Sequence, residues 1–484
     1  MKRNFCFLLL LITFSVSAQV KNFTETGEQI TKFDDLGRAV DAHDGKISYF
    51  NGTYYLYGTS YDCGFEWNNK IAPFCGFKTY SSKDMVNWKD EGFMFDAKSS
   101  LWQSRCDGKT YGCFRPHVVY NKKNKQYVLW INVYDNVIGY RVFTSKSPIG
   151  PFTEVAEPKI VVNKDKPAAG LNNGDHDLFI DDDGKAYIAI TDWRMKGAIA
   201  IEELDDNYLS GTGKLVTGVT KGNTEAPGLF KRNNIYYVTY SDPNCGYCSG
   251  TGTSYVTAKS PLGPWSAGKK ISDNSCGGQP SFVSTINLPG GKVFLYGSDL
   301  WNNAAKNEAL ANFYWAPLTF AEDGSINPME CLKSFKIGKK KAVSKDSGEF
   351  KAVCEITNIV QRKQVFTASK SGTLDEFNLA TLKSGYPNSD LIIDFFEENS
   401  NKKLSSVKIP ADAIGWSAKD LRVNPNFPVT LSKRYVFVVS TASTSGCFGY
   451  AKGKAANEGS FLSNDSGKSF KDDVYSLRFS YSVK

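Results

Sequence analysis

Three carboxyl side chains stand at the start of three similar segments of the chain. Asp44, Asp175 and Glu225 each precede a short apolar run, a turn and an aromatic-rich run. Two further segments of the same pattern begin with Arg115 and Gln279. One such residue alone can be explained as a turn former. Three carboxyl groups, a guanidinium and an amide at matching places of five segments predict a chemical site instead.

Paired carboxyl groups are what the hydrolysis of a glycosidic bond requires. One group gives a proton to the leaving oxygen and needs a raised pKa, while the other stays ionised and takes a proton from water. Glu225 lies in Thr-Glu-Ala-Pro-Gly, whose apolar neighbours favour a protonated carboxyl. We therefore assign Glu225 as the general acid and Asp44 as the general base. Asp175 is expected to orient Glu225 and to tune its pKa.

The repeat also predicts the elements that position these residues. The first segment, residues 44–58, reads as a strand, a tight turn and a second strand, and later segments follow about 50 to 70 residues apart. A period of this size with short strands is typical of propeller blades. The innermost strand of each blade lines a central channel, so the five leading residues should meet at its mouth. We predict an all-β chain with a five-bladed β-propeller over residues 19–320.

The chain beyond the repeats changes character. Residues 321–342 read as a linker with a basic run. Residues 343–484 are rich in Ser and Thr and contain alternating stretches such as Arg434-Tyr-Val-Phe-Val-Val-Ser. This pattern predicts a β-sandwich accessory domain, whose role is either carbohydrate binding or support of the fold.

The N-terminal segment predicts export. Lys2 and Arg3 precede an apolar run, and Val16-Ser17-Ala18 is a small-residue cleavage site. These features describe a signal peptide over residues 1–18, which is too short to cross a bilayer. We expect a secreted or periplasmic protein without membrane insertion.

Charge and cysteine content bear on partners and cofactors. The net charge is +8, but the lysines are scattered and not interleaved with aromatics, so nucleic acid is not an expected partner. Ten Cys follow the signal peptide, and an even count in an exported chain favours disulfides. Cys245 and Cys248 have redox or zinc spacing, but the chain has only three His, which favours a loop disulfide. We expect a monomer without cofactor or metal centre, and leave open a structural calcium ion in the channel.

Several residues near the starts of the repeats are candidates for binding a polysaccharide or oligosaccharide. Aromatic faces suit the apolar face of a sugar ring, although each aromatic could equally belong to a blade core. Arg115 is itself a leading residue, and the two imidazole groups lie within two residues of one. The candidates are His43, Arg115, His117, Trp193, Tyr240 and Trp301.

The ordered set of motifs resembles glycoside hydrolase family 43. The resemblance implies a five-bladed propeller with an Asp base, an Asp pKa modulator and a Glu acid in that chain order. It also implies an inverting reaction, with base and acid roughly 6.5–9.5 Å apart to leave room for the water. The motifs are Asp44 before Tyr54-Tyr-Leu-Tyr-Gly58, Ser82-Lys-Asp-Met-Val-Asn-Trp88, Asp175 before Phe179-Ile-Asp-Asp-Asp-Gly-Lys-Ala-Tyr187, and Glu225-Ala-Pro-Gly.

The motifs are most similar to the branch of that family that includes exo-β-1,3-galactanases. In this branch the base position is often not acidic, and a Gln that matches Gln279 is thought to position the water. The present sequence departs from the branch because it keeps Asp44, and because Phe114 precedes Arg115 where a Glu is frequent. Related subfamilies that remove α-L-arabinofuranose or β-galactose fit as well.

Two functions of different kinds follow from these observations. The first is a secreted, inverting exo-glycosidase that acts on plant-type galactan or arabinogalactan at β-galactosyl or α-L-arabinofuranosyl residues. The alternative is a non-catalytic, lectin-like propeller that only binds carbohydrate. Loss of one of the three carboxylates would indicate the lectin-like propeller, but Asp44, Asp175 and Glu225 are all present.

Overall fold

The computed structural model describes residues 19–484 except 65–71, 107–111, 135–138, 162–173, 244–248, 302–306, 338–347, 401 and 455–458. The predicted signal peptide and the predicted pair of Cys245 and Cys248 lie outside the described residues. Strands form most of the regular structure, and one short α-helix, α1 (Ser100–Arg105), is present in the described part. No helix in that part is long and apolar enough to cross a membrane.

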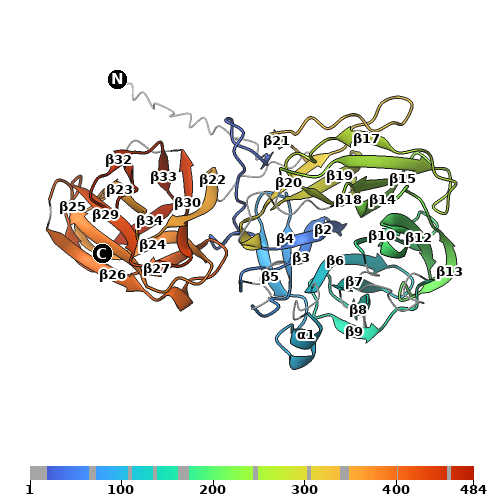
Figure 1. Cartoon of the computed structure of the whole chain (residues 1–484), viewed down its shortest axis with the longest axis horizontal. Coiled ribbons are helices and arrows are strands. Elements are labelled where there is room, and N and C mark those ends of the chain that lie inside the picture. The colour runs from blue at the N-terminus through green and yellow to red at the C-terminus, as the bar shows by residue number, and fades with distance from the viewer. Residues whose placement is uncertain are drawn as a thin grey trace, which may run out of the picture.

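Five antiparallel sheets lie around one centre (Figure 1), and in each the strands pair in chain order. The first contains β2 (His43–Phe50), β3 (Thr53–Thr59), β4 (Phe77–Ser82) and β5 (Lys89–Phe93). The second contains β6 (Gly112–Asn121), β7 (Gln126–Tyr134), β8 (Arg141–Ser145) and β9 (Thr153–Ala156). The third contains β10 (His176–Ile180), β11 (Ala186–Asp192), β12 (Ala198–Leu204) and β13 (Gly211–Val216), with a 3-10 turn, η2 (Trp193–Met195), after β11. The fourth contains β14 (Glu225–Arg232), β15 (Ile235–Ser241), β16 (Thr253–Ala258) and β17 (Lys269–Ser272). The fifth contains β18 (Gln279–Leu288), β19 (Gly291–Leu300) and β20 (Asn312–Pro317), with η4 (Glu308–Leu310) before β20.

The first strands of these sheets close a ring. β2 contacts β6, β6 contacts β10, β10 contacts β14, β14 contacts β18, and β18 returns to β2. This arrangement is a five-bladed β-propeller, which confirms the predicted fold class. Local sequence supports the blades, since Asn51 and Gly52 both have positive φ in the turn between β2 and β3. Such two-residue turns match the twist of a β-hairpin.

Two further sheets form the C-terminal domain, seen on the left of Figure 1. Their facing sides pack aromatic rings together, with Phe377 5.1 Å from Phe395 and 4.8 Å from Phe437. One sheet contains β22 (Phe350–Ile356), β24 (Gly372–Ser384), β27 (Lys419–Val423), β28 (Phe427–Val429), β30 (Cys447–Lys454), β33 (Tyr475–Leu477) and β34 (Phe479–Val483). The other contains β23 (Gln361–Thr367), β25 (Leu391–Glu397), β26 (Lys403–Ile409), β29 (Arg434–Thr441), β31 (Ser460–Ser463) and β32 (Lys471–Asp472), and η5 (Ala411–Ala413) follows β26.

The segment between the two domains runs along the propeller. Within the predicted linker, β21 (Ser334–Phe335) pairs with β1 (Val20–Lys21) near the start of the chain. The Cys276–Cys331 disulfide ties the same segment to the fifth blade. Described disulfides also join Cys63 to Cys75, Cys106 to Cys113 and Cys354 to Cys447.

Candidate active site

The first strands of three blades turn sharply near their beginnings. β2, β6 and β14 each carry an irregularity in their pairing within the first few residues. At each of these bulges a residue other than glycine has left-handed backbone, with φ of 54° at Asp44, 57° at Arg115 and 51° at Ala226. Such conformations cost energy, and bulges of this kind re-aim side chains beside active sites.

The positions of the bulges give an alignment of the blades that differs from the one predicted from the sequence. Ala226, not Glu225, has the register position of Asp44 and Arg115. Glu225 comes immediately before its bulge, as Phe114 does in the second blade. The sequence pattern placed Glu225 at the position of Asp44, and the structure shows a difference of one residue. The reason is that the pattern aligned the acidic residues by type: Asp44 lies ten residues before Tyr54, whereas Glu225 lies eleven residues before the equivalent Tyr236.

Asp44 is held by donors on both of its oxygens. Its Oδ1 accepts hydrogen bonds from the Thr59 hydroxyl at 2.9 Å and the Arg115 backbone N–H at 3.0 Å, and its Oδ2 accepts one from the Tyr61 hydroxyl at 3.0 Å. The backbone N–H of Asp44 donates to Asp299 Oδ2 at 3.1 Å. Burial raises the pKa of Asp44 to about 7, against the opposing effect of the Arg115 charge. A carboxyl with this pKa can accept a proton near neutral pH.

Arg115 links Asp44 to the second predicted carboxylate. Its guanidinium donates to Asp175 Oδ2 at 2.9 Å and to the Ser281 carbonyl at 3.1 Å. Asp175 Oδ2 also accepts the backbone N–H of Ala226 at 3.2 Å. Because Ala226 directly follows Glu225 in the chain, Asp175 fixes the backbone from which Glu225 projects.

Gln279 completes the set of leading residues. Its side-chain amide donates to Glu225 Oε2 at 3.0 Å, and the residue is buried. Hydrogen bonds therefore connect all five leading residues. The link between Asp175 and Glu225 is indirect, because it runs through the backbone N–H of Ala226, which follows Glu225. In this structure the partner of the Gln279 amide is the predicted acid, and a role in positioning water stays a prediction.

His43 lies beneath Asp44, between two further carboxylates. Its Nε2 is 3.5 Å from Asp41 Oδ1, its Nδ1 is 3.7 Å from Asp299 Oδ1, and its ring stacks on Phe313. Burial lowers the pKa of His43, but Asp299 and Asp41 outweigh this effect and raise it to about 9. A cationic His43 thus supports Asp299, the acceptor of the Asp44 N–H. The imidazole is completely buried, so its predicted contact with substrate remains a proposal.

His117 belongs to a second buried cluster, deeper in the channel. Its Nδ1 lies 3.1 Å from Asp177 Oδ1, and burial lowers its pKa to about 4, so the ring is neutral. Asp177 also pairs with the Lys46 ammonium and accepts the Leu229 backbone N–H at 2.8 Å. The ring of His176 lies 5.0 Å from that of His117. In the described part of the chain, no group of three or more His, Cys, Asp or Glu side chains is arranged to hold a metal ion.

The three aromatic candidates lie in different surroundings. Trp301 is half-buried on the Asp44 side, with its ring 5.7 Å from His43 and 6.1 Å from Tyr61. Trp193 is also half-buried and lies beside Gly197. The Gly197 carbonyl accepts a hydrogen bond from the hydroxyl of Thr224, the residue before Glu225. Tyr240 lies apart from both, in an apolar cluster between the third and fourth blades with its hydroxyl beside Gly268.

Sequence reasoning missed four polar residues of the site. They are Asp41, Thr59, Tyr61 and Asp299. Asp299 could have been found from pairing alone, because it lies directly opposite Gln279 in the fifth blade. Thr59 is the last residue of β3, and Asp41 and Tyr61 lie just outside strands, where the alternating pattern ends.

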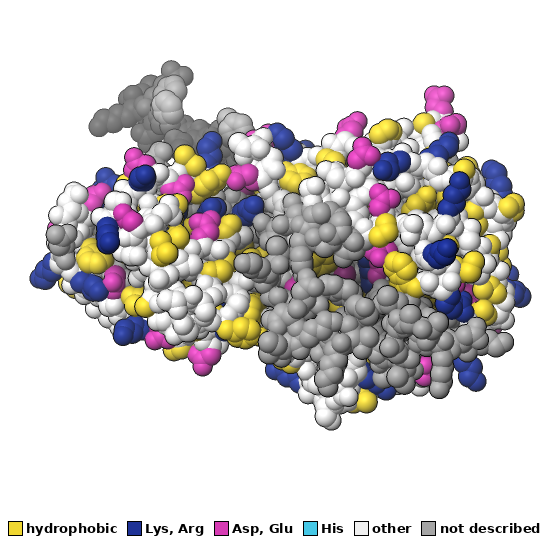
Figure 2. Space-filling model, in the orientation of Figure 1, with side chains coloured by type: hydrophobic (Ala, Val, Ile, Leu, Met, Phe, Trp, Pro, Cys, Tyr) yellow, Lys and Arg dark blue, Asp and Glu magenta, His cyan; other side chains and the backbone are white. Residues whose placement is uncertain are grey.

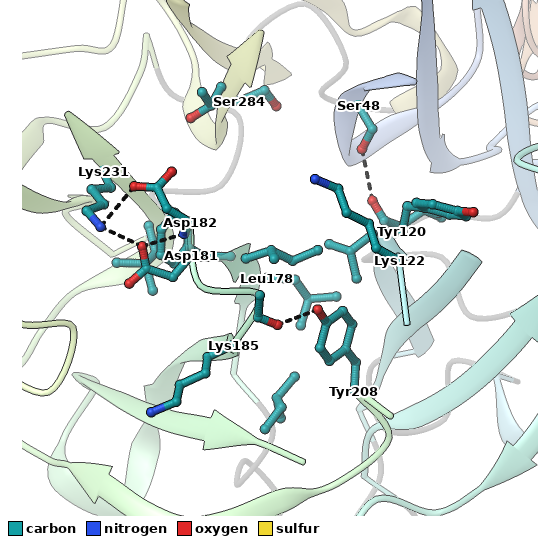
Figure 3. A pocket seen from close by; sticks show the side chains of 18 of the residues that line it. Ser48, Tyr120, Lys122, Leu178, Asp181, Asp182, Lys185, Tyr208, Lys231 and Ser284 are labelled. Atoms are coloured by element: carbon teal, nitrogen blue, oxygen red, sulfur yellow. Dashed lines mark hydrogen bonds and ion pairs between the residues drawn. The ribbon is translucent and has the colours of Figure 1, made fainter. Parts of the chain in front are cut away.

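A large hollow lies at the opposite mouth of the channel. It has a volume of about 1420 Å³ and is lined by the far ends of the first strands and by their turns. Figure 3 shows that Lys231 reaches both Asp181 and Asp182 there, at 2.7 and 3.0 Å. Over the visible face of both domains, lysines and carboxylates are interspersed (Figure 2). None of the residues that line this hollow belongs to the hydrogen-bonded carboxylate set of the other mouth.

Solved structures of similar fold include two exo-β-1,3-galactanases. The enzyme from Phanerochaete chrysosporium, in complex with β-1,3-galactotriose, is 20% identical, with a TM-score of 0.52 and coverage of 90% of this chain and 99% of that chain. The enzyme from Clostridium thermocellum is 19% identical, with a TM-score of 0.54 and coverage of 90% and 91%. At these identities the likeness shows a shared fold, and it extends over the C-terminal domain.

Sequence comparison identifies the family. A β-D-galactofuranosidase of Aspergillus niger is 25% identical over 293 residues, which are 59% of this chain and 82% of that protein. An arabinoxylan arabinofuranohydrolase of Bacillus subtilis is 25% identical over 296 residues, or 54% of this chain and 57% of that protein. The model of glycosyl hydrolases family 43 matches residues 38–282, just over half of the chain. The family resemblance of the motifs is thereby confirmed: the chain belongs to glycosyl hydrolases family 43 and is a glycosidase.

Proposed function

We propose that the protein is an exported, inverting exo-glycosidase that removes β-galactosyl or α-L-arabinofuranosyl residues from plant-type galactan or arabinogalactan. The observation that carries the proposal is the hydrogen-bonded set of Asp44, Arg115, Asp175, Glu225 and Gln279 at one mouth of the channel. A propeller that only binds sugar would not need three carboxylates in fixed orientation. Proton transfer at two oxygens does need them.

The proposed reaction divides the proton transfers between two sides of the sugar. Glu225 gives its proton to the glycosidic oxygen as the bond from that oxygen to the anomeric carbon breaks. Asp44 takes a proton from a water that attacks the same carbon from the opposite face, which inverts its configuration. After product release, the proton passes from Asp44 to solvent and Glu225 is protonated again.

The other members of the set act on these two groups. Arg115 lies between Asp44 and Asp175 and compensates the negative charge of both carboxylates. Asp175 holds the backbone that follows Glu225 and tunes the pKa of the acid. Gln279 positions Glu225 and, when substrate is bound, the water or the sugar.

The names of similar proteins support the choice of substrate. They include a β-D-galactofuranosidase, arabinoxylan arabinofuranohydrolases and exo-β-1,3-galactanases. We infer from them a terminal galactosyl or arabinofuranosyl residue as the unit removed. Four described disulfides support export, because such bonds persist in oxidising compartments.

The test is hydrolysis of a panel of β-1,3-galactan, arabinogalactan, arabinan, β-1,4-galactan and aryl glycosides. We expect one monosaccharide to be released from chain ends, and proton NMR to show it first as the inverted anomer. Binding without turnover across the panel would favour the lectin-like alternative. A first product of retained configuration would contradict the inverting mechanism.

A further inference from the structure

The segment that follows β3 connects the predicted base to the C-terminal domain. The loop that follows β3 begins with Ser60, Tyr61 and Asp62. All three residues donate hydrogen bonds to the buried carboxylate of Asp41. The Ser60 hydroxyl donates to Asp41 at 2.6 Å, and the backbone N–H groups of Tyr61 and Asp62 donate at 2.9 and 3.1 Å. This side of the segment is therefore fixed from within the propeller.

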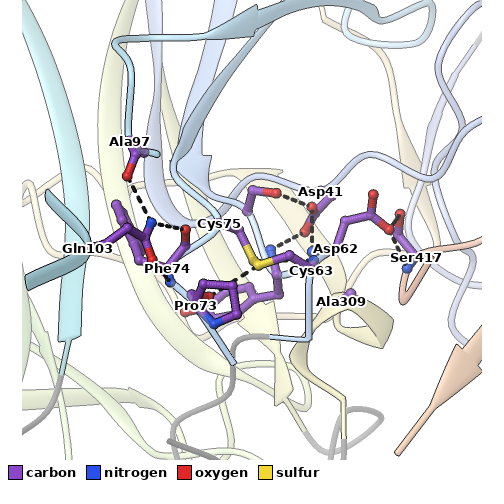
Figure 4. Close-up of a disulfide and its surroundings, with 12 residues drawn as sticks. Asp41, Asp62, Cys63, Pro73, Phe74, Cys75, Ala97, Gln103, Ala309 and Ser417 are labelled. Atoms are coloured by element: carbon purple, nitrogen blue, oxygen red, sulfur yellow. Dashed lines mark hydrogen bonds between the residues drawn. A yellow bond between two sulfur atoms is a disulfide. The ribbon is translucent and has the colours of Figure 1, made fainter. Parts of the chain in front are cut away.

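The other side of the segment is held by the C-terminal domain. Asp62 Oδ1 accepts the backbone N–H of Ser417 at 2.8 Å and its hydroxyl at 2.7 Å, and Asp62 Oδ2 pairs with the ammonium of Lys419. The backbone N–H of Trp416 donates to the Asp62 carbonyl at 3.3 Å. Figure 4 shows Asp62 between Asp41 on one side and Ser417 on the other.

The fit of the two domains here is close. Trp416 is buried against Gly64, where a Cβ would lie 2.4 Å from the Trp416 ring, so only glycine allows this approach. The side-chain amide of Asn307 donates to the carbonyl of Trp416 at 2.8 Å. Asn307 is the residue directly before η4. The loop 415–419 thus contacts the loops that follow β3 and β19. These are the loops that flank the Asp44 side of the site.

The segment reaches the reacting groups through one hydroxyl. Tyr61 donates to Asp44 Oδ2 at 3.0 Å, and the residue is buried. Burial raises the pKa of Tyr61 well above its ordinary value, so the phenol keeps its proton and can donate at all working pH values. A hydrogen bond from a neutral donor to a carboxylate favours the ionised carboxylate.

We propose that the C-terminal domain is a positioning part of the active site: loop 415–419 holds Asp62, and thereby holds the Tyr61 hydroxyl on Asp44. The inference rests on the proposed function of Asp44 as base. It makes the C-terminal domain part of one catalytic unit with the propeller. Tyr61 and Asp62 are positioning residues in this account, since they act through Asp44.

The charged groups around Asp44 decide what the experiment measures. Arg115 faces it from β6 and favours its ionised form, while Asp299 faces it from β19 and disfavours it. His43 lies on β2 between Asp41 and Asp299, and Glu308 of η4 faces Tyr61. Asp62→Ala removes a negative charge, which alone would lower the pKa of Asp44, and Lys419→Met removes a positive charge, which alone would raise it. An upward shift in both variants therefore reports on the Tyr61 hydrogen bond.

The test compares four variants in the full chain by the pH dependence of kcat/KM. The acidic limb of this profile is the fall of kcat/KM at low pH, where Asp44 becomes protonated. Tyr61→Phe removes the hydroxyl and should give the largest effect, an upward shift of this limb by roughly one pH unit. Asp62→Ala and the double variant Ser417→Ala/Lys419→Met break the same contact, the first from the propeller and the second from the C-terminal domain. We expect each to move the limb in the same direction by a part of that shift, and to add little when combined with Tyr61→Phe.

Tyr475→Phe is the matched control. It removes another hydrogen bond between the C-terminal domain and the rest of the chain, from the Tyr475 hydroxyl to Glu28 at 2.8 Å. We expect it to leave the limb in place. If Asp62→Ala and the double variant lower the melting temperature like the control but leave the limb unchanged, the contact is only structural and the proposal is overturned.

A second readout separates this inference from the proposed function. The carboxyl carbon of Asp44, labelled with carbon-13 and assigned with Asp44→Asn, can be titrated by NMR without any substrate. An upward shift of its pKa in Asp62→Ala supports the positioning role even if no sugar on the panel is hydrolysed. An unchanged pKa overturns it even if hydrolysis is found.

Discussion

The two mouths of the propeller channel differ in what holds their polar groups. At one mouth, Asp44 and Asp175 are buried and receive hydrogen bonds from backbone and side-chain donors of neighbouring blades. At the other mouth lies the hollow of about 1420 Å³, where Lys231 pairs with the turn residues Asp181 and Asp182. A large hollow therefore does not by itself locate the chemistry in this fold. Fixed orientation and burial of carboxylates do.

The two mouths also differ in which residue types have left-handed backbone. The catalytic mouth contains left-handed residues other than glycine at Asp44, Arg115 and Ala226, within bulges. At the opposite mouth, turns such as Asn51-Gly52 and Asn233-Asn234 use residue types that tolerate positive φ, with Lys125 as an exception. Strain is thus found where side chains must be aimed, which agrees with the general association of strained backbone with functional sites.

The strongest test of the catalytic mouth is removal of the acid. We expect Glu225→Gln to lower kcat on polysaccharide by about 10²- to 10⁴-fold, the usual contribution of a general acid. The loss should be smaller on aryl glycosides whose leaving group needs little protonation. An equal loss on both kinds of substrate would contradict the role of Glu225 as acid.

Arg115 tests whether orientation matters beyond charge. Arg115→Lys keeps the positive charge but loses the planar fork that reaches both Asp175 and the Ser281 carbonyl. We expect kcat to fall by about 10- to 100-fold, with little change in the melting temperature measured by circular dichroism. Near-wild-type kcat would mean that charge alone is sufficient at this position.

Gln279 is expected to contribute less. Gln279→Ala removes the hydrogen bond to Glu225 but leaves both proton-transfer groups. Steady-state kinetics should show a fall in kcat of about tenfold, equivalent to about 1.4 kcal/mol. A loss as large as that of Asp44→Asn would instead assign the positioning of the water to Gln279.

The opposite mouth should tolerate change. Lys231→Met with Asp181→Asn removes an ion pair from the lining of the large hollow. Because neither side chain contacts the catalytic set, we expect kcat/KM to stay within about twofold of wild type, since distant sites without shared partners act nearly independently. A large loss would show that substrate or product uses this end of the channel.

The repeat made the blades predictable, because each blade needs the same strand, turn and aromatic strand. The leading residues were predictable for the same reason, and Asp44, Arg115, Asp175, Glu225 and Gln279 are brought together by contacts. The offset of Glu225 by one residue is present in its spacing to Tyr236, but alignment by residue type alone hid it. The hydrogen bonds of Asp44 with Asp299 and of Asp62 with Ser417 join residues 255 and 355 positions apart, which no local pattern reveals.

The candidates for sugar contact show the limit of residue type as a guide. His43 and His117 are completely buried and act on carboxylates, one as a cation and the other as a neutral ring. Nothing in the sequence separates these two roles. The difference comes from the number of carboxylates that tertiary structure places around each ring.

The most direct test of the account is the pH dependence of kcat/KM for wild type and Asp44→Asn. Burial raises the pKa of Asp44 to about 7, and a base must be ionised to act, so wild-type kcat/KM should fall tenfold per unit as pH drops below about 7. Asp44→Asn should lose roughly 10²- to 10⁴-fold in rate, and its residual hydrolysis should lack this acidic limb. Hydrolysis by Asp44→Asn at a near-wild-type rate with the same limb would contradict the assignment of Asp44 as the base.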